Sequence, residues 1–410
     1  MSLRSQISAR YSAFDYSSTK QAINFGYGLP DPDTFPHLPA VDAMSLRAGV
    51  SLADILQYTD SQGLPELRQR LADRSGVTPG QVMITSGASQ ALQLIADALL
   101  DPGDVVLTED PSYLGALRIF TIAGAKVIQL GMDSEGVLLS ELADALTRYP
   151  SAKLYYTTPA FHNPSGQCIS KRRAVEVQNL LARHGVPIVQ DLVYSELPYE
   201  DGLQPVLFPS DAAISVRSFS KIAWPGLRVG WICAEPAMIA RLALLKCDGG
   251  VSAVVSNIAL ALLDAGGLDG HIQFLRGHYR QKRDRMHALL QDCTFCEPAY
   301  AIPQGGFSFW VKLAAHLDPV EFLEGLRHPQ GVQLAPGLLY GPRSSQFVRL
   351  CFSYMPAARI EEGIARIEAA CKASRRLRQS LGRLHDEERD SLAEYKTRRE
   401  TTRGASRFIL

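Results

Sequence analysis

The chain has 410 residues, of which 46% are hydrophobic and 20% charged, so it can bury one large core with a lobe or two cores of ordinary size. The formal net charge of zero gives no argument for a nucleic acid or an acidic partner. No apolar stretch approaches the roughly 20 residues of a membrane span, and the first residues, MSLRSQISARYSAFDYSS, lack the apolar core of a secretory signal.

Seven cysteines are scattered through the chain, an odd number without the spacing of a disulfide framework. This pattern predicts a reduced, cytoplasmic protein. Cys293 and Cys296 form a CxxC pair, but no second pair accompanies it. We therefore interpret both as buried thiols and expect no metal site.

Residues up to about 42 are rich in proline and are expected to be irregular. From residue 63 onward, short apolar stretches alternate with stretches that carry apolar residues at helical spacing. Helices are expected at 64–74, 88–100, 113–124 and 174–185, and strands at 81–85, 104–110, 126–130, 152–159, 187–191 and 213–220. Such an alternation predicts an α/β fold with a doubly wound, mainly parallel sheet.

After about residue 270 the pattern changes. A long charged helix is expected at 270–292, followed by alternating strands at 307–313 and 347–354, which indicates a smaller α+β lobe. The tail at 372–410 is dominated by charges of both signs, so we expect a solvated helix or a frayed end. Because these charges are mixed rather than clustered, a nucleic-acid-binding arm is the weaker interpretation.

Several polar residues stand at the ends of predicted strands. Ser86 to Gln90 lie between a strand and a helix, where free backbone N–H groups and the helix dipole suit an anion such as phosphate. Ser218 and Ser220 would add hydroxyl donors, and Arg228 would add a permanent cation. Each residue alone also has an ordinary structural explanation. The absence of Walker A, GxGxxG, HExxH and GxSxG patterns leaves these strand ends as the candidate site.

Three further strand ends carry residues that suit a ring-shaped ligand. Asp191 closes an apolar stretch, where an unpaired carboxylate would be costly, so it needs a partner such as a protonated pyridine nitrogen. Asn163 precedes a proline and is expected in an extended or turn conformation, and Tyr113 offers a flat ring. Helix capping, turn formation and core packing explain each residue separately. They do not explain why all of them fall at strand ends, where open α/β sheets bind ligands.

From about residue 24 to 370 the chain resembles the fold-type I, class I/II aminotransferases that use pyridoxal 5′-phosphate (PLP). The likeness is greatest to the α-aminoadipate and kynurenine aminotransferase branch. The motifs that carry it are, in order, GLPDPDTFP, LQYTDSQGLPELR, TSGASQAL, DPSYLGAL, YYTTPAFHNPSG, QDLVYSEL, SFSKIAWPGLRVGW, PQGGFSFW and VRLCFSY. Nine motifs in the family's order are a far stronger signal than any one of them.

The resemblance implies a role for each residue of the candidate site. Lys221 forms the Schiff base with PLP, since a primary amine can exchange its imine with the substrate and then act as a base. Burial and neighbouring cations are expected to lower the pKa of this lysine below its usual value of about 10.4. The phosphate is held by Ser89, Gln90, Ser218, Ser220 and Arg228. Tyr58 reaches the phosphate of a neighbouring subunit, which implies a homodimer.

The resemblance also assigns the cofactor ring and the substrate. Asp191 keeps the pyridine nitrogen protonated, Asn163 and Tyr194 bond the 3-oxygen, and Tyr113 stacks on the ring. Arg349 forms a bidentate pair with the substrate α-carboxylate, which a planar guanidinium fits better than an ammonium group does. Gly28 leaves room for the N-terminal segment to close on the substrate. Asn163 is expected to contact the substrate as well.

We therefore predict an aminotransferase that moves an amino group from an L-α-amino acid to a 2-oxo acid. The expected domains are an N-terminal segment at 1–42 that joins the small lobe, a PLP-binding domain at 43–265, a small domain at 266–371 and the charged tail at 372–410. The same residues would also serve a cyclase, an eliminase or an oxidase of this fold. A PLP-sensing half of a transcription regulator is a further alternative, which we disfavour because only about 40 residues precede the core. Arg217 and His162 depart from the branch's pattern, and His162 is the one placed to bear on the substrate.

Overall fold

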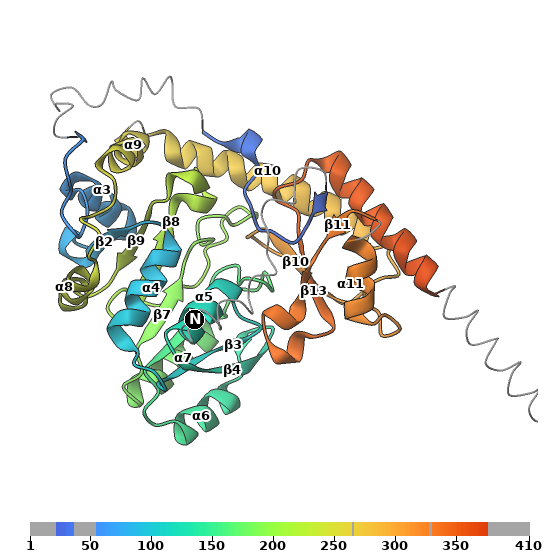
Figure 1. Ribbon diagram of the computed structural model, residues 1–410, viewed down its shortest axis with the longest axis horizontal. Coiled ribbons are helices and arrows are strands. Elements are labelled where there is room, and N and C mark those ends of the chain that lie inside the picture. Colours follow the sequence, from blue (N-terminus) through green and yellow to red (C-terminus); the bar gives the residue numbers. More distant parts are fainter. Residues whose placement is uncertain (1–21, 37–54, 265, 328–329, 376–410) are drawn as a thin grey trace, which may run out of the picture.

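The computed structural model describes residues 22–36, 55–264, 266–327 and 330–375 of the chain. Figure 1 shows a large sheet flanked by helices in one part of the molecule, and smaller sheets with the last helix in the other. The long helix α10 (Gly267–Leu290) runs along one side of both parts, close to the range predicted for it. The predictions for residues 1–21 and for the tail beyond 375 lie outside the described residues.

The sheet of the larger part has eight strands in the order β2-β9-β8-β7-β6-β3-β4-β5. Their bounds are Val82–Thr85 (β2), Gly230–Cys233 (β9), Ala213–Ser218 (β8), Ile188–Asp191 (β7), Leu154–Thr157 (β6), Val105–Asp110 (β3), Lys126–Asp133 (β4) and Gly136–Val137 (β5). The pairs β8–β7, β7–β6, β6–β3 and β3–β4 are parallel, and β9 is antiparallel to both β8 and β2. The predicted mainly parallel α/β sheet is confirmed.

Successive residues of the central strands pack against different helices. Val106 and Tyr156 lie in one core with α4 (Ala88–Leu99), α5 (Leu114–Ile122) and α8 (Pro236–Leu245). Their chain neighbours Leu107 and Tyr155 lie in another core with α6 (Leu139–Arg148) and α7 (Lys171–Arg183). Because side chains alternate between the two faces of a strand, both faces of this sheet are buried, as a doubly wound fold requires.

Strand direction gathers the candidate residues at one edge of this sheet. β9 is antiparallel to both of its neighbours, so β2 runs the same way as β8, β7, β6 and β3. The carboxyl ends of all five strands therefore lie along one edge. The loops that follow them carry the predicted residues, and in open α/β sheets this edge is where ligands bind.

The smaller part contains two further sheets. β1 (Ile23–Asn24) pairs in parallel with β11 (Val332–Gln333), so the N-terminal segment joins the C-terminal part of the chain. β10 (Ser308–Lys312) and β12 (Ala335–Pro336) both pair antiparallel with β13 (Phe347–Cys351). Helix α11 (Pro319–Arg327) and the helical residues 357–375 pack against them. Positions 42, 43 and 265 lie outside the described residues, so the domain limits stay predictions.

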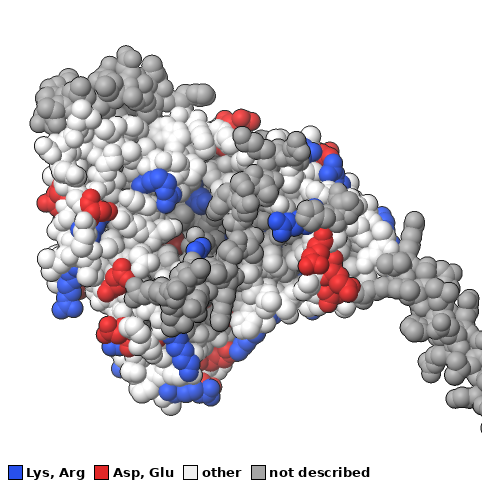
Figure 2. Space-filling model, viewed as in Figure 1, with Lys and Arg blue, Asp and Glu red and all other residues white. Residues whose placement is uncertain are grey.

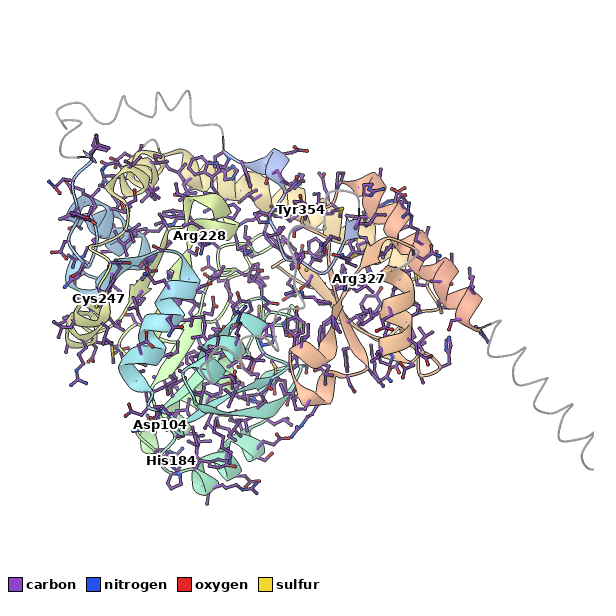
Figure 3. All side chains as sticks on the ribbon, in the orientation of Figure 1. Asp104, His184, Arg228, Cys247, Arg327 and Tyr354 are labelled. Carbon is purple, nitrogen blue, oxygen red and sulfur yellow. The ribbon has the colours of Figure 1, made fainter. Side chains whose placement is uncertain are left out.

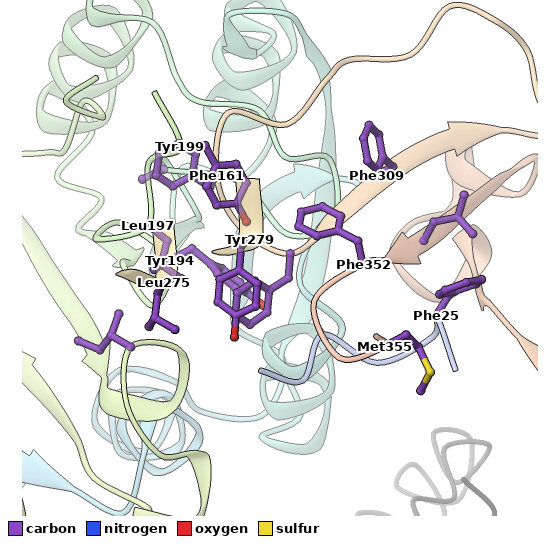
Figure 4. Close-up of a cluster of buried hydrophobic side chains, with 14 of the residues drawn as sticks. Phe25, Phe161, Tyr194, Leu197, Tyr199, Leu275, Tyr279, Phe309, Phe352 and Met355 are labelled. Carbon is purple, nitrogen blue, oxygen red and sulfur yellow. The ribbon is translucent and has the colours of Figure 1, made fainter. Parts of the chain in front are cut away.

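One hydrophobic core continues from the larger part into the smaller. The ring of Phe307 lies 4.7 Å from that of Tyr279 in α10 and 5.3 Å from that of Tyr194, measured between centroids. Figure 4 shows Tyr194 and Tyr279 close together, with Phe352 and Phe25 further along the same cluster. Full burial of a phenylalanine side chain stabilises a fold by roughly 1.5–3 kcal/mol. This cluster therefore holds the N-terminal strand and the loop after β7 in a fixed relation.

The described surface carries charges of both signs. Figure 2 shows acidic and basic side chains interspersed over one face of the molecule.

Among the described residues, no single helix is long and apolar enough to cross a membrane. Helices α9 (Ala253–Asp264) and α10 reach that length and composition only as a pair, and the pair is bent by 82°. Helix α3 (Pro65–Ser75) packs against α9 through buried leucines.

Candidate active site

A cavity of about 410 Å³ lies at the carboxyl edge of the eight-stranded sheet. Most residues that the sequence predicts for the site line it: Gly28, Ser89, Tyr113, Asn163, Asp191, Tyr194, Ser218, Ser220, Lys221, Arg228 and Arg349. A larger hollow of about 540 Å³ lies between residues 195–205 and α10, but its lining contains none of them. The smaller cavity is therefore the candidate site.

Lys221 closes the short 3-10 turn Phe219–Lys221 that follows β8, so the strand end brings its amine to the cavity. Its Nζ donates a hydrogen bond of 2.7 Å to the carbonyl oxygen of Gly28. Burial and the positive charge of Arg349 lower the pKa of Lys221 to about 8. The neutral amine, which both a nucleophile and a base require, is thus much more populated here than at a surface lysine.

Groups suited to an anion meet in the same cavity. The hydroxyl oxygens of Ser218 and Ser220 lie 2.8 Å apart. Ser89 is the second residue of α4, where backbone N–H groups have no partner within the helix and the helix dipole is positive. Arg228 adds a permanent cation, and Figure 3 shows it near the centre of the molecule, away from Cys247 at the outer edge.

Gly87 makes the close approach of Arg228 to this helix end possible. Its φ of +80° lies in the region that favours glycine, and a Cβ atom there would come within 2.7 Å of Nη2 of Arg228. That nitrogen donates a hydrogen bond of 3.2 Å to the carbonyl oxygen of Ser86. The sequence offered no specific signal for this contact, because the glycine and the arginine are far apart in the chain.

Gln90 directs its side chain elsewhere. Its Oε1 accepts the backbone N–H of Ser86 at 2.7 Å, and its Nε2 donates to Asp248 Oδ2 at 2.8 Å. Of the predicted Ser89–Gln90 pair, Ser89 lines the cavity and Gln90 does not. Gln90 instead shapes the turn before α4, so what it offers an anion is its backbone N–H at the helix start.

Asp191 stands at the end of β7 with only 5% of its surface exposed. Burial raises the pKa of this carboxyl to about 6, although it accepts the N–H of Val193 and the hydroxyl of Tyr156, each at 3.1 Å. At neutral pH it is therefore mainly a carboxylate in a poorly solvated place. Such a group is strongly stabilised by a cationic partner, as a protonated ring nitrogen would be.

Arg349 of β13 is 7% exposed and lies opposite the sheet edge. Its Nη1 donates to Asn163 Oδ1 at 2.8 Å and its Nη2 to the carbonyl oxygen of Gly26 at 2.6 Å. The ring of Tyr340 lies 5.0 Å from the guanidinium carbon. Its Nε is buried and has no partner among the described residues. The guanidinium is thus held in place with donor capacity left for a carboxylate.

Two tyrosines and two glycines shape the rest of the wall. Tyr113 precedes α5, and a Cβ atom at Gly115 would come within 2.4 Å of its ring, so that glycine makes room for it. The ring of Tyr194 packs edge-on against Phe307. At Gly28, a Cβ atom would lie 3.2 Å from the Tyr194 hydroxyl, and a side chain there would press on the wall.

Tyr58 lies apart from the cavity of its own chain. Its side chain is 86% exposed and borders a separate hollow with Leu56 and residues 248–254. Gly249 lies beneath the ring, since a Cβ atom there would come within 3.1 Å of it.

The remaining predicted positions do not line the cavity. His162 is buried next to Asn163 but contacts Ser165 and not the cavity. Arg217 lies in β8, opposite Trp231 of β9. Burial raises the pKa of Cys293 and Cys296 to about 12, so both are protonated thiols. Among the described residues no group of histidine, cysteine or acidic side chains could hold a metal ion.

The donors and acceptors of the cavity fit a phosphorylated pyridine aldehyde. Ser89, Ser218, Ser220 and Arg228 supply donors for a phosphate, while the buried carboxylate of Asp191 suits a protonated ring nitrogen. Lys221 supplies an amine that is partly neutral. The unpaired Nε of Arg349 shows that one buried donor still lacks an acceptor, which an α-carboxylate would supply.

Comparison with known proteins agrees with this chemistry. The family model of class I and II aminotransferases matches residues 20–367. An aromatic-amino-acid aminotransferase of Thermococcus litoralis is 31% identical over 380 residues, which cover 86% of this chain and 89% of that protein. An uncharacterized HTH-type transcriptional regulator of Bacillus subtilis, YisV, is 34% identical over 368 residues, which cover 87% of this chain and 75% of that protein.

Solved structures give the same picture. LysN, the α-aminoadipate aminotransferase of Thermus thermophilus, matches this structure with a TM-score of 0.83 and 28% identity. The match covers 91% of this chain and 98% of that one. The LysN structure is a complex with N-(5′-phosphopyridoxyl)-L-leucine, a cofactor joined to an amino acid.

Proposed function

The chain belongs to the class I and II aminotransferases, and from this membership we propose how its residues divide the reaction among them. The predicted resemblance to the α-aminoadipate aminotransferase branch is confirmed. The protein is a PLP-dependent enzyme that moves an amino group from an L-α-amino acid to a 2-oxo acid. The proposal rests on one observation: Lys221, Asp191 and Arg349 line the same cavity.

Lys221 has two tasks in this proposal. When bound, PLP supplies an electron sink and a carbonyl carbon that stores the amino group between the two half-reactions. Lys221 would hold the cofactor through its neutral amine, and with a substrate in the site its Nζ would take the proton from the substrate Cα. The pKa of about 8 suits both tasks, because an amine with a pKa near the working pH both releases and accepts a proton readily.

Asp191 and the phosphate donors orient the cofactor. The carboxylate of Asp191 would keep the ring nitrogen protonated, and Tyr156 and Val193 fix that carboxylate by hydrogen bonds. Ser89, Ser218, Ser220 and Arg228 anchor the phosphate at the start of α4. Tyr113 would stack on the ring, and Asn163 and Tyr194 would donate to its 3-oxygen. Since these groups come from different strand ends, the sheet itself fixes their relative positions.

Arg349 and Asn163 select the substrate. The guanidinium pairs with the α-carboxylate, so amino acids bind in preference to simple amines. Gly26 and Asn163 already hold two of its nitrogens, which reduces the conformational freedom that substrate binding would otherwise cost. Gly28 keeps a side chain away from the Tyr194 hydroxyl in the wall of the cavity, which leaves room there for the substrate.

A single-turnover experiment tests the assignment of the reaction. We expect that mixing the PLP form with an L-amino acid, without any 2-oxo acid, converts the cofactor stoichiometrically to pyridoxamine phosphate. Adding 2-oxoglutarate or pyruvate should then restore the PLP form. Absorbance and cofactor extraction over a panel of amino acids would measure both steps and identify the preferred donor. Release of product with the PLP form regenerated, and without any oxo acid consumed, would point instead to cyclisation, elimination or oxidation.

We infer that the enzyme is a homodimer whose active sites are shared between subunits. Tyr58 is exposed, and it lines a separate hollow and not the cavity of its own chain. Leu56 beside it and Leu244 of α8 are 67% and 84% exposed. Exposed apolar side chains mark a contact surface when they form one patch, and we propose that these side chains do so. A second subunit that covers them would receive Tyr58 at its own phosphate site.

Co-expression of two variants tests this arrangement. In a mixed dimer of Tyr58→Phe and Lys221→Ala chains, one site combines an intact Lys221 with an intact Tyr58 of the other chain. We expect that site to work at the wild-type rate, whereas each Tyr58→Phe homodimer site should be about tenfold slower for want of one phosphate hydrogen bond. Purified mixed dimers that stay at the slower rate, or an active monomer in sedimentation, would contradict the shared site.

We also propose that the enzyme works in the cytoplasm. All seven cysteines are free thiols, and four of them are buried. Disulfides are common in oxidising compartments and rare in reducing ones. The exposed Cys247 is a free thiol, as expected for a protein in a reducing compartment.

A further inference from the structure

Next to Asn163 in the chain, but outside the active-site cavity, His162 faces Glu109 of β3. The two side chains are 2% and 3% exposed, and His162 Nε2 lies 4.0 Å from Glu109 Oε2. This distance is too long for a direct hydrogen bond. Both atoms are fully buried, and neither has a hydrogen-bond partner among the described residues. Buried polar atoms in folded proteins are nearly always paired, so these two need an explanation.

The other polar atoms of the pair are satisfied. Glu109 Oε1 accepts the hydroxyl of Tyr155 at 2.8 Å. His162 Nδ1 lies 2.8 Å from the hydroxyl oxygen of Ser165 and accepts the backbone N–H of Ser165 at 3.4 Å. Because Nδ1 accepts this N–H, it carries a lone pair and the ring proton sits on Nε2. Burial lowers the pKa of His162 to about 3, so the ring is neutral at neutral pH. Burial raises the pKa of Glu109 to about 7, and hydrogen bonds from Thr157 and Tyr155 to this carboxyl oppose the rise. In the ionised form, Oε2 of Glu109 is therefore an acceptor that faces the Nε2–H donor of His162.

A cavity of about 10 Å³ is lined by both residues, and Thr157 and Gln167 add polar atoms to its wall. A volume of this order, by the same measure, holds a single water molecule when two or more polar groups line it. We propose that one water bridges His162 Nε2 and Glu109 Oε2, and that this bridge positions Asn163 in the active site. His162 and Glu109 are thus positioning residues and not catalytic ones.

The backbone explains how the bridge reaches the site. The loop after β6 is closed by its own hydrogen bonds, from His162 N to Gln167 O at 2.7 Å and from Gly166 N to His162 O at 2.6 Å. Such a loop moves as a unit, and the bridge would tie it to β3 of the central sheet. Asn163 follows His162 directly, and its Oδ1 accepts Nη1 of Arg349 at 2.8 Å. The inference rests on the proposed pairing of Arg349 with the substrate carboxylate.

A crystal structure of the holoenzyme at high resolution gives a readout that does not depend on activity. We expect an ordered water within about 3.2 Å of both His162 Nε2 and Glu109 Oε2. In His162→Asn, the amide oxygen takes the place of Nδ1 and still faces Ser165, but nothing stands where Nε2 was. The water should then be lost and Asn163 should move away from Arg349. An empty cavity in the wild type, or a direct bond between the two side chains, would overturn the proposal.

Kinetics give the second readout. His162→Asn is expected to raise KM for the amino acid about tenfold, with a much smaller change in kcat, because Lys221 and its environment are retained. Glu109→Gln keeps an acceptor and should retain a KM close to that of the wild type. Met132→Leu alters the wall of the same small cavity without touching a polar group, and its KM should be unchanged.

Three outcomes separate the possible explanations. If His162→Asn lowers the melting temperature but leaves KM unchanged, the pair serves folding alone and the proposal is wrong. If KM rises equally for a simple amine that lacks the α-carboxylate, the effect does not pass through Arg349, and the proposal is equally wrong. If Arg349→Met itself leaves KM unchanged, the proposed substrate site fails, while the bridging water can still be seen or refuted in the crystal.

Discussion

Replacing Lys221 with alanine is expected to reduce transamination by about 10⁴-fold or more while the protein still folds. In the proposed mechanism the amine both binds the cofactor and moves the Cα proton, and loss of a general base alone costs up to about 10⁴-fold. The side chain makes one hydrogen bond, to the carbonyl oxygen of Gly28, so its removal deletes little else. Single-turnover rates with the amino acid identified by the panel would measure the loss.

Borohydride reduction provides the matching chemical measurement. In the wild type, reduction followed by digestion should fix the cofactor to the peptide that contains Lys221. In Lys221→Ala no covalent link should form, so the cofactor should be released when the protein is denatured. Lys282→Ala is the control, since that buried lysine pairs with Asp31 and the carbonyl oxygen of Ser353, outside the cavity. It should lose stability but keep the covalent cofactor. A cofactor still reducibly bound to Lys221→Ala would refute the assignment.

The sequence predicted the elements of the fold that local pattern controls. Alternating apolar strands and amphipathic helices indicated the parallel sheet, and polar residues at strand ends indicated the edge where the cavity lies. Strand β9 was not predicted, because it has only four residues, Gly230–Cys233, and the first two belong to the motif SFSKIAWPGLRVGW. Helices α6, α8 and α9 also went unassigned, although their boundaries follow the same rules.

Contacts that depend on strand register were not accessible in the same way. Tyr156 supports Asp191 only because β6 and β7 pair in parallel with Tyr156 opposite Val189. Glu109 faces His162 for a similar reason. Glu109 belongs to β3, which pairs in parallel with β6, and His162 lies in the loop that follows β6. A motif names the residues that touch the cofactor. A motif does not identify the supporting residues, which belong to other strands and fix the cofactor-binding residues in place.

Gln90 illustrates the opposite case, a motif residue whose side chain takes another role. Its position at the start of α4 matched a phosphate site, yet its amide bonds Ser86 and Asp248. A residue at a helix start can serve an anion through its backbone while its side chain caps the turn. A sequence pattern predicts the backbone role, because that role depends only on the position at the helix start. It does not predict which groups the side chain bonds.

Arg349→Met is expected to lower kcat/KM for amino acids by about 10²–10³-fold. Truncating one partner of a buried, hydrogen-bonded charge pair costs roughly 2–5 kcal/mol, and each 1.4 kcal/mol is tenfold. Methionine roughly retains the volume but removes the charge and the fork of donors. Steady-state kinetics with an amino acid and with the amine that lacks its α-carboxylate would measure the effect. The loss should be confined to the amino acid.

The same variant should change the titration of Lys221. In the wild-type apoprotein, we expect acylation of Lys221, followed by peptide mass spectrometry, to rise with pH through a midpoint near 8. After burial, the charge of Arg349 is the main cause of that low pKa, because a nearby cation disfavours the protonated amine. Arg349→Met removes the repulsion, so the pKa of Lys221 and the midpoint should both move upward.

Arg349→Lys separates charge from geometry. It keeps a positive charge near Lys221, so the acylation midpoint should stay near that of the wild type. It loses the planar fork that binds a carboxylate with two hydrogen bonds, so kcat/KM for amino acids should still fall. If Arg349→Lys restored full activity, the bidentate pairing would be wrong, and charge alone would explain substrate binding. If Arg349→Met left the midpoint near 8, burial alone would set the pKa of Lys221, and the guanidinium would act on the substrate without tuning the amine.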